Sequence, residues 1–211
     1  MHGMSFSLEK RIFIICPVRG ITDDEKKIID DYVSILESNH MKVHYPARGD
    51  TNQDDPVGLN ICSQNRAAIK HATSVCQHYN PTSTGSVFDD GMSFFAGKPL
   101  FIINNEYFQK PKLTEFEDFL KQYSTNAGTC KTTKFYKTLL RRAEQIEKAK
   151  IIEYNWKSNN PDFLFDFGMS FMAEKPIILL NREEVEKQRT PHKSFQNVLL
   201  TLDDMYRNKT Q

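Results

Sequence analysis

A twelve-residue pattern occurs twice in this chain and limits the folds that the chain can adopt. Residues 88–99 (FDDGMSFFAGKP) and 165–176 (FDFGMSFMAEKP) are identical at nine of twelve positions. Tyr-Asn precedes each copy, and an Asn follows the short apolar run after each copy. A helix–strand–helix–strand segment has therefore been used twice, with a period too long for a solenoid. The copies form either extra units on one sheet or a pseudo-symmetric pair inside one chain.

Short apolar runs alternate with helical patterns in the first half of the chain. The run RIFIIC at 11–16 lacks polar alternation, which is typical of a strand buried on both faces of a parallel sheet. Thr22 and Glu25 form a capping box at the start of the next helix. The alternation predicts an α/β fold of the flavodoxin or Rossmann-like type, with a parallel sheet and helices on both faces. We expect strands at 11–16, 41–45, 74–79 and 99–103, and helices near 22–36, 57–70 and 87–96.

The 211 residues suit a single α/β domain with appended elements. Residues 11–104 form its expected core, 149–181 carry the second copy of the motif, and 182–211 are predicted to be a helical tail. Two more helices are expected at 113–123 and 133–148, around a loop that contains Gly128.

Charge and cysteine content exclude several classes of function. With 28 basic and 27 acidic residues, the net charge of +1 gives no case for a nucleic acid polymer or an anionic membrane surface. No apolar run at the N-terminus is long enough for a membrane span or a signal peptide. Four scattered cysteines without a Cys-x-x-Cys pair indicate reduced thiols in a cytoplasmic protein, and no metal or redox cofactor is expected.

Polar loops follow the predicted strands, at the sheet edge where parallel α/β proteins bind ligands. The loop 82–86 runs into a helix N-terminus, where free N–H groups and small hydroxyls suit a phosphate. The simpler alternative is that Ser83 or Thr84 only caps the helix. Asp89 lies in the first turns of that helix and is either a nucleophile for a sugar carbon or a partner of the helix dipole.

Five segments of the chain carry a resemblance to a known family: 11–20, 44–46, 50–53, 83–92 and 97–99. Together they resemble the nucleoside 2-deoxyribosyltransferase family, which includes the 2′-deoxynucleoside 5′-monophosphate N-glycosidases. The resemblance covers about half the chain, and part of the same pattern recurs in residues 149–181. It implies a flavodoxin-like fold and cleavage of the N-glycosidic bond of deoxynucleosides by a carboxylate, with the sugar passing to another base or to water.

The resemblance also implies roles for single residues. Asp89 falls at the nucleophile, and Asn52 and Gln53 fall where the family contacts the base. Ser83 falls where the transferases have an Asp for a free 5′-hydroxyl and the monophosphate glycosidases have a Ser. Because a carboxylate would repel a phosphate and a hydroxyl would not, Ser83 with Arg19 favours a nucleotide. The expected substrate-binding residues are Arg19, Gly20, Asp50, Asn52, Gln53, Asp54, Asp55, Ser83 and Gly85.

Three positions depart from the family pattern. Asp89 stands where the usual nucleophile is Glu, Thr73 where the family has an Asp for proton transfer to the base, and Phe13 where it has a Tyr that orients the nucleophile. Asp54 or Asp55 is a candidate to replace the lost acid. The departures leave an alternative function, a nucleotide-binding or sensor protein of the same fold that does not catalyse.

In the second copy, Asp166 occupies the nucleophile position and Asn160 the Ser83 position. We predict that this copy is scaffold or a degenerate site. The expected partner is a nucleoside or nucleotide. Family members are often homo-oligomers that share active-site residues, so a homodimer is expected unless the second copy supplies the neighbour within one chain.

Overall fold

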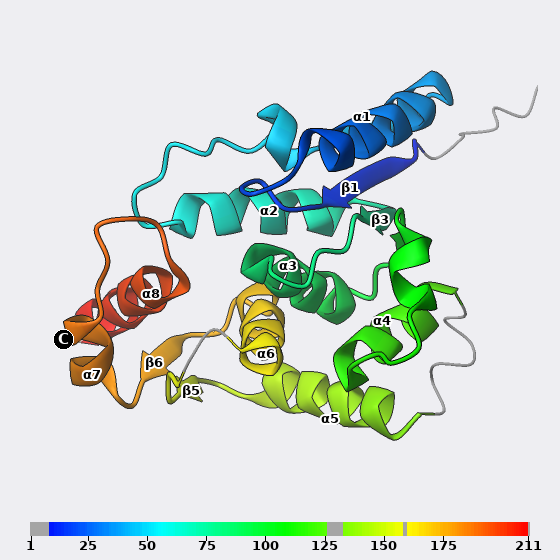
Figure 1. The fold of residues 1–211 in the computed structure, drawn as a ribbon. Helices are drawn as coiled ribbons and strands as arrows, with labels where there is room; N and C mark the ends of the chain where they lie inside the picture. The colour runs from blue at the N-terminus through cyan, green and yellow to red at the C-terminus, as the bar shows by residue number, and fades with distance from the viewer. Residues whose placement is uncertain (1–8, 126–132, 158–159, 211) are drawn as a thin grey trace, which may run out of the picture.

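The computed structural model describes residues 9–125, 133–157 and 160–210. Its larger sheet is fully parallel, with the strand order β2-β1-β3-β4. The predicted α/β class is confirmed, and Figure 1 shows the helices that flank this sheet. The expected loop residue Gly128 and the fourth cysteine, Cys130, lie outside the described residues. The strands are β1 (Arg11–Ile15), β2 (Lys42–His44), β3 (Ser74–Gln77) and β4 (Leu100–Ile102).

The two faces of the sheet are buried by different helices. Successive side chains of a strand point to opposite faces, and β1 shows both sides of this rule. Ile12 and Ile14 share a hydrophobic cluster with Ile29 of α1, whereas Phe13 and Ile15 belong to the cluster that contains α2 and α3 side chains. These helices are α1 (Asp23–Ser38), α2 (Leu59–His71) and α3 (Thr84–Phe95).

The second half of the chain builds a separate unit. β5 and β6 pair in parallel with each other and not with the four-stranded sheet. The second copy therefore does not extend the first sheet, and of the two alternatives the pseudo-symmetric pair is confirmed. The predicted tail contains two helices. The remaining elements are η1 (Pro46–Arg48), η2 (Asn105–Gln109), α4 (Glu115–Thr125), α5 (Lys134–Lys148), β5 (Ile152–Tyr154), α6 (Pro161–Met172), β6 (Ile177–Leu179), α7 (Arg182–Lys187) and α8 (Phe195–Thr210).

The repeat extends over whole elements, so that α5-β5-α6-β6 reproduces α2-β3-α3-β4. In each copy, an asparagine at the matching position forms two hydrogen bonds with the backbone of the preceding loop. Asn104 accepts the Tyr79 N–H at 2.8 Å and donates to the Tyr79 carbonyl at 2.8 Å. Asn181 binds the backbone of Trp156 in the same way, at 2.9 and 2.7 Å. The conserved spacing therefore reflects the same three-dimensional unit built twice.

The two copies meet where α3 packs on α6, as Figure 1 shows near the centre of the molecule. Gly91 of α3 faces the carbonyl of Phe165, and a Cβ at this glycine would lie 2.1 Å from that oxygen. Gly168 of α6 faces the carbonyl of Phe88 with the same 2.1 Å separation. This reciprocal contact shows that glycine is required at both positions, because it brings the two helix backbones together.

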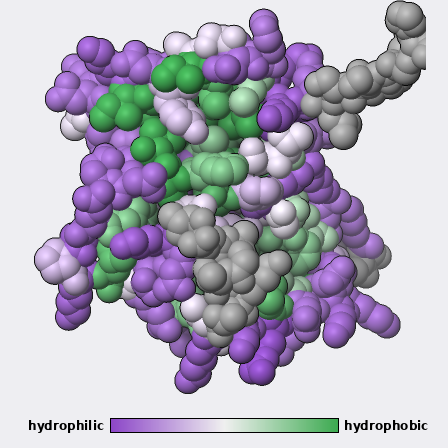
Figure 2. Space-filling model, turned by 90° about the vertical axis from the view of Figure 1, so that its right-hand side faces the viewer, coloured by the Kyte–Doolittle hydropathy of each residue, from purple (hydrophilic) through white to green (hydrophobic). Residues whose placement is uncertain are grey.

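No helix in the described part of the chain is long and apolar enough to cross a membrane. On the face shown in Figure 2, hydrophobic surface lies between hydrophilic margins. Three cysteines of the described residues, Cys16, Cys62 and Cys76, are buried free thiols.

Candidate active site

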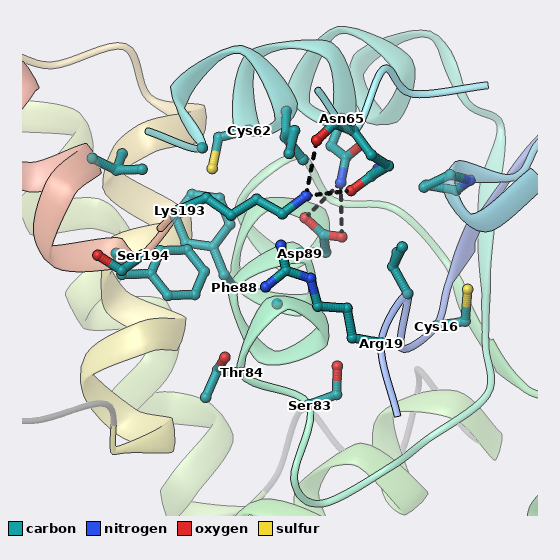
Figure 3. A pocket seen from close by; sticks show the side chains of 18 of the residues that line it. Cys16, Arg19, Cys62, Asn65, Ser83, Thr84, Phe88, Asp89, Lys193 and Ser194 are labelled. Atoms are coloured by element: carbon teal, nitrogen blue, oxygen red, sulfur yellow. Dashed lines mark hydrogen bonds between the residues drawn. The ribbon is translucent and has the colours of Figure 1, made fainter. Parts of the chain in front are cut away.

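A cavity of about 400 Å³ opens beyond the carboxyl end of β1, beside the N-terminus of α3. Strand order reverses between β1 and β3, and open α/β sheets bind ligands at such a switch point. The volume suits a small organic molecule. Side chains from the loop after β1, from α2, from α3 and from the segment before α8 line it, as Figure 3 shows.

Asp89 contributes the carboxylate of this cavity. Thr84, Gly85, Phe88 and Asp89 lie on the face of α3 that lines it, which follows from helical spacing. Asp89 is only 8% exposed. Burial raises the pKa of this carboxyl to about 7, although a hydrogen bond from Asn65 opposes the rise. Near neutral pH, Asp89 is therefore present in both its ionised and its protonated form.

Asn65 of α2 is the direct partner of Asp89. Its Nδ2 lies 3.1 and 3.4 Å from the two carboxylate oxygens, and these contacts are drawn in Figure 3. Its Oδ1 accepts a 2.8 Å hydrogen bond from the hydroxyl of Thr51, and Nε2 of His44 lies 2.9 Å from the same hydroxyl. No sequence motif points to Asn65. Its position on the buried stripe Cys62–Asn65–Ile69 is the signal that could have found it.

The N-terminus of α3 forms another wall of the cavity. The Ser83 hydroxyl caps the helix, accepting the Ser86 N–H at 3.3 Å, and lies 2.8 Å from the Ser86 hydroxyl. Ser83 therefore caps α3, and a phosphate site at this helix end stays a prediction. Ser83, Thr84 and Gly85 also line the cavity, so the positive end of the helix dipole faces its interior.

Two cationic side chains reach the cavity from segments far apart in the sequence. Arg19 follows β1, and Lys193 precedes α8 (Figure 3). Nζ of Lys193 donates to the backbone carbonyl and to Oε1 of Gln53, at 3.0 and 3.1 Å. Burial lowers the pKa of Lys193, and repulsion by Arg19 lowers it further. Among the described residues neither cation forms an ion pair with a carboxylate.

Lys193, Ser194, Phe195 and Val198 line the cavity although they follow the second copy of the repeat. One wall of a cavity that lies in the first copy therefore comes from the second half of the same chain. This wall could not be predicted from the sequence, because a lysine in a polar loop belongs to no motif. Phe195 packs on Phe88 with ring centroids 4.9 Å apart, which fixes the segment against α3.

The other expected binding residues divide into two groups. Arg19, Gln53, Ser83 and Gly85 line the cavity with Asp89. Gly20, Asp50, Asn52, Asp54 and Asp55 are not among its lining residues.

Several of the second group have structural roles instead. Asp50 accepts the Tyr45 N–H at 2.7 Å and pairs with Arg48 at 3.1 Å. The Asn52 side chain is exposed and accepts the Asp54 N–H at 2.9 Å.

Asp55 was expected to be a candidate acid for the leaving base, and the structure gives it another task. Its carboxylate accepts three backbone N–H groups at the start of α2, from Val57, Asn60 and Ile61, at 3.0, 2.7 and 3.2 Å. Burial acts to raise its pKa, but these hydrogen bonds outweigh burial and lower it. Asp55 is therefore an ionised helix cap and not a proton donor.

Two of the three positions that depart from the family pattern, Thr73 and Phe13, are not among the residues that line the cavity. Thr73 binds the backbone of Arg11, accepting its N–H at 3.2 Å and donating to its carbonyl at 2.9 Å. Phe13 is fully buried and stacks on His44, with ring centroids 5.4 Å apart. Neither residue lines the cavity.

In the second copy, Arg142 takes the place of Asn65 and Asp166 that of Asp89. Nη1 of Arg142 lies 3.3 Å from Oδ1 of Asp166. Burial raises the pKa of Asp166 to about 6, with Arg142 acting against the rise. Asn160 caps α6, accepting the Phe163 N–H at 2.7 Å. In the second copy a guanidinium thus pairs with the carboxylate, where the first copy has an amide beside it. That the second copy is scaffold or a degenerate site stays a prediction.

Within the described residues, no group of three or more His, Cys, Asp or Glu side chains could hold a metal ion. In comparisons with protein-family models, curated proteins and solved structures, no match to this chain was found.

Proposed function

We propose that this chain cleaves the N-glycosidic bond of 2′-deoxynucleosides or their 5′-monophosphates, passing the sugar to water or to another base. The observation that carries the proposal is Asp89, a buried carboxylate beside a cavity of about 400 Å³. Arg19 and Lys193 line the same cavity and form no ion pair with any of the described residues. The type of reaction is proposed from the resemblance of residues 11–104 to nucleoside 2-deoxyribosyltransferases.

Asp89 is the only carboxylate among the residues described as lining the cavity. In its ionised form it attacks C1′ of the sugar, and the bond from C1′ to the base nitrogen breaks as the new ester bond forms. The base leaves with the electron pair and takes a proton from water, because no second carboxyl group is among the described residues that line the cavity. The hydroxide left by that water takes up the proton of the water or base that attacks next. Water or a second base then attacks C1′ and releases Asp89.

The 5′-monophosphate is favoured over the free nucleoside by charge. Arg19, Lys193 and the N-terminus of α3 all present positive potential to the same cavity, and among the described residues neither cation forms an ion pair with a carboxylate. A phosphate near Ser83 and Thr84 would accept hydrogen bonds from the helix N-terminus and neutralise both cations. Gln53, which also lines the cavity, supplies an amide for the base.

The direct test is release of free base. The purified chain is incubated with each of the four 2′-deoxynucleoside 5′-monophosphates and with the matching nucleosides, and the products are separated by chromatography. We expect free base from at least one monophosphate, with a rate that rises as pH increases through about 7, because the ionised form of Asp89 is the reactive one. Release that is constant from pH 5 to 9 contradicts the role of Asp89.

Replacing Lys193 should raise KM for monophosphates much more than KM for nucleosides. Lys193→Met keeps the apolar stem and removes the charge, so we expect KM for the monophosphate to rise about 10- to 100-fold, as for loss of a charge-assisted hydrogen bond. KM for the nucleoside should change little. Lys187→Met, which removes an exposed lysine of α7, serves as the matched control. An equal effect on both substrates would show that Lys193 only holds Gln53.

A second function is favoured by the absence of a second carboxyl group from the described cavity lining. A nucleotide-binding or sensor protein would use the same cations without turnover. It predicts thermal stabilisation by a monophosphate, about 2.7 kcal/mol at a hundredfold excess over Kd, with no base released. In either case we place the protein in the cytoplasm, where the buried free thiols Cys16, Cys62 and Cys76 stay reduced.

A further inference from the structure

A line of three hydrogen-bonded side chains joins a neighbouring loop and strand to Asp89. It runs from Nε2 of His44, at the end of β2, to the Thr51 hydroxyl at 2.9 Å, and from that hydroxyl to Oδ1 of Asn65 at 2.8 Å. From Asn65 it continues through Nδ2 to the carboxylate of Asp89 at 3.1 Å. Thr51 and Asn65 are buried, and His44 is partly buried.

The direction of these hydrogen bonds is determined by counting protons. The Thr51 hydroxyl has one proton, and it is donated to Oδ1 of Asn65. His44 must then donate its Nε2–H to the Thr51 oxygen. With its oxygen bound to Thr51, the amide of Asn65 can present only its NH₂ group to Asp89. The reversed amide would place an oxygen against the carboxylate and would break the bond from Thr51.

We propose that His44 and Thr51 are positioning residues for Asp89, which fix the amide of Asn65 so that a donor always faces the carboxylate. Neither residue lines the cavity or touches a substrate placed in it. They act through Asn65 and favour the ionised form of Asp89, the form that can attack a sugar carbon. His44 in turn is oriented by its stacking on Phe13.

The second copy of the repeat supports this assignment independently. At the position of Asn65 it has Arg142, which also donates to the equivalent carboxylate, Asp166. A guanidinium has only donors and cannot present an oxygen. The described second unit contains no counterpart of β1 and β2, and therefore no counterpart of Thr51, which follows β2. An amide that needs orientation occurs only in the copy that has Thr51 to orient it.

Other charged and titratable groups also act on these residues. Burial lowers the pKa of His44, with Asp50 opposing and Arg48 adding to the effect, so the ring is neutral near pH 7 and carries one proton. That single proton is the one placed on Nε2. The groups that face Asp89 from its own and neighbouring elements are Asp90, Cys16, Cys62, Arg19 and Lys193.

The test follows the ionisation of Asp89 without any substrate. The chain is labelled with ¹³C at the aspartate carboxyl carbons, and the Asp89 signal is assigned by its loss in Asp89→Asn. In Thr51→Val, which keeps the shape and removes the hydroxyl, we expect the pKa of Asp89 to rise by about one unit. Thr51→Ser restores the hydroxyl and should restore the titration. An unchanged titration in Thr51→Val overturns the proposal.

A second pair of variants covers the case in which Thr51→Val does not fold. His44→Phe keeps the stacking on Phe13 and removes the donor, whereas His44→Gln keeps an N–H near the position of Nε2. We expect the pKa of Asp89 to rise in the first variant and not in the second. If both variants titrate alike, His44 has no positioning role.

The kinetic consequence rests on the proposed function. If base is released, the pH profile of kcat in Thr51→Val should move upward by the same amount as the titration, with KM unchanged because Arg19 and Lys193 are untouched. Absence of base release would reject the glycosidase but leave the titration result valid. A normal titration with normal turnover would reject the positioning role and leave the glycosidase intact.

Discussion

Asp89→Asn should abolish base release and, at the same time, make the protein more stable at pH 8. The carboxyl is 8% exposed, and burial raises its pKa to about 7, so the folded state holds the proton more tightly than the unfolded chain does. Stability from this group is therefore complete below about pH 4 and is lost as pH rises towards 7. Asparagine does not titrate and still offers an oxygen to Asn65.

The size of the gain follows from the pKa shift. A rise from 3.8 to about 7 corresponds to about 4 kcal/mol of destabilisation above pH 7, and relaxation around the site reduces this. We expect Asp89→Asn to raise the free energy of unfolding by about 2–4 kcal/mol at pH 8, with the gain shrinking towards pH 4. Urea denaturation at both pH values measures it.

A suitable control is Asp31→Asn, which removes an exposed carboxylate from α1. It should change stability by no more than about 0.5 kcal/mol at either pH. Loss of base release with no gain in stability at pH 8 would mean that Asp89 is ionised without cost in the folded protein. A stable variant that still releases base would remove Asp89 from the reaction.

The sequence predicted those features that depend on local pattern. Alternating apolar runs and helical spacing identified the parallel sheet, and the capping box of Thr22 and Glu25 starts α1 as expected. The repeat predicted that one helix–strand unit is built twice, because each copy carries the same strand and helix signals. Local patterns, however, do not say which strands pair. The choice between one sheet and two was therefore left to the structure.

The site was predicted only where it belongs to the first copy. Asp89, Ser83, Arg19 and Gln53 lie next to strand ends, where a parallel sheet gathers its functional loops. Lys193 reaches the cavity because α3 packs on α6 and brings α8 alongside, a tertiary contact that leaves no mark in the residues around it.

The role of Asp55 could not be read from the sequence for a related reason. A carboxylate in a loop after a strand can bind a ligand or can satisfy the free N–H groups of the next helix, and the sequence is the same in both cases. Asp55 does the second, with three backbone N–H groups as its partners. Only the structure shows that these N–H groups already bind both oxygens of the Asp55 carboxylate.

Gly91→Ala should be among the most damaging substitutions in the chain. Helix propensity alone predicts the opposite, because alanine stabilises a helix interior by about 1 kcal/mol relative to glycine. At Gly91, however, the new Cβ would lie 2.1 Å from the carbonyl oxygen of Phe165, and a backbone atom cannot move aside as a side chain can. The contact between α3 and α6 must open. We expect a loss of at least 3 kcal/mol in the free energy of unfolding.

The same helix provides the control. Gly85 is also within α3, and a Cβ there meets no atom within 4 Å, so Gly85→Ala should be neutral or slightly stabilising. Gly168→Ala should repeat the loss, since its Cβ would lie 2.1 Å from the carbonyl of Phe88. Because one substitution already separates the helices, the double variant should lose clearly less than the two single losses added together. Additive losses, or a stable Gly91→Ala, would show that the two copies are not held together through these glycines.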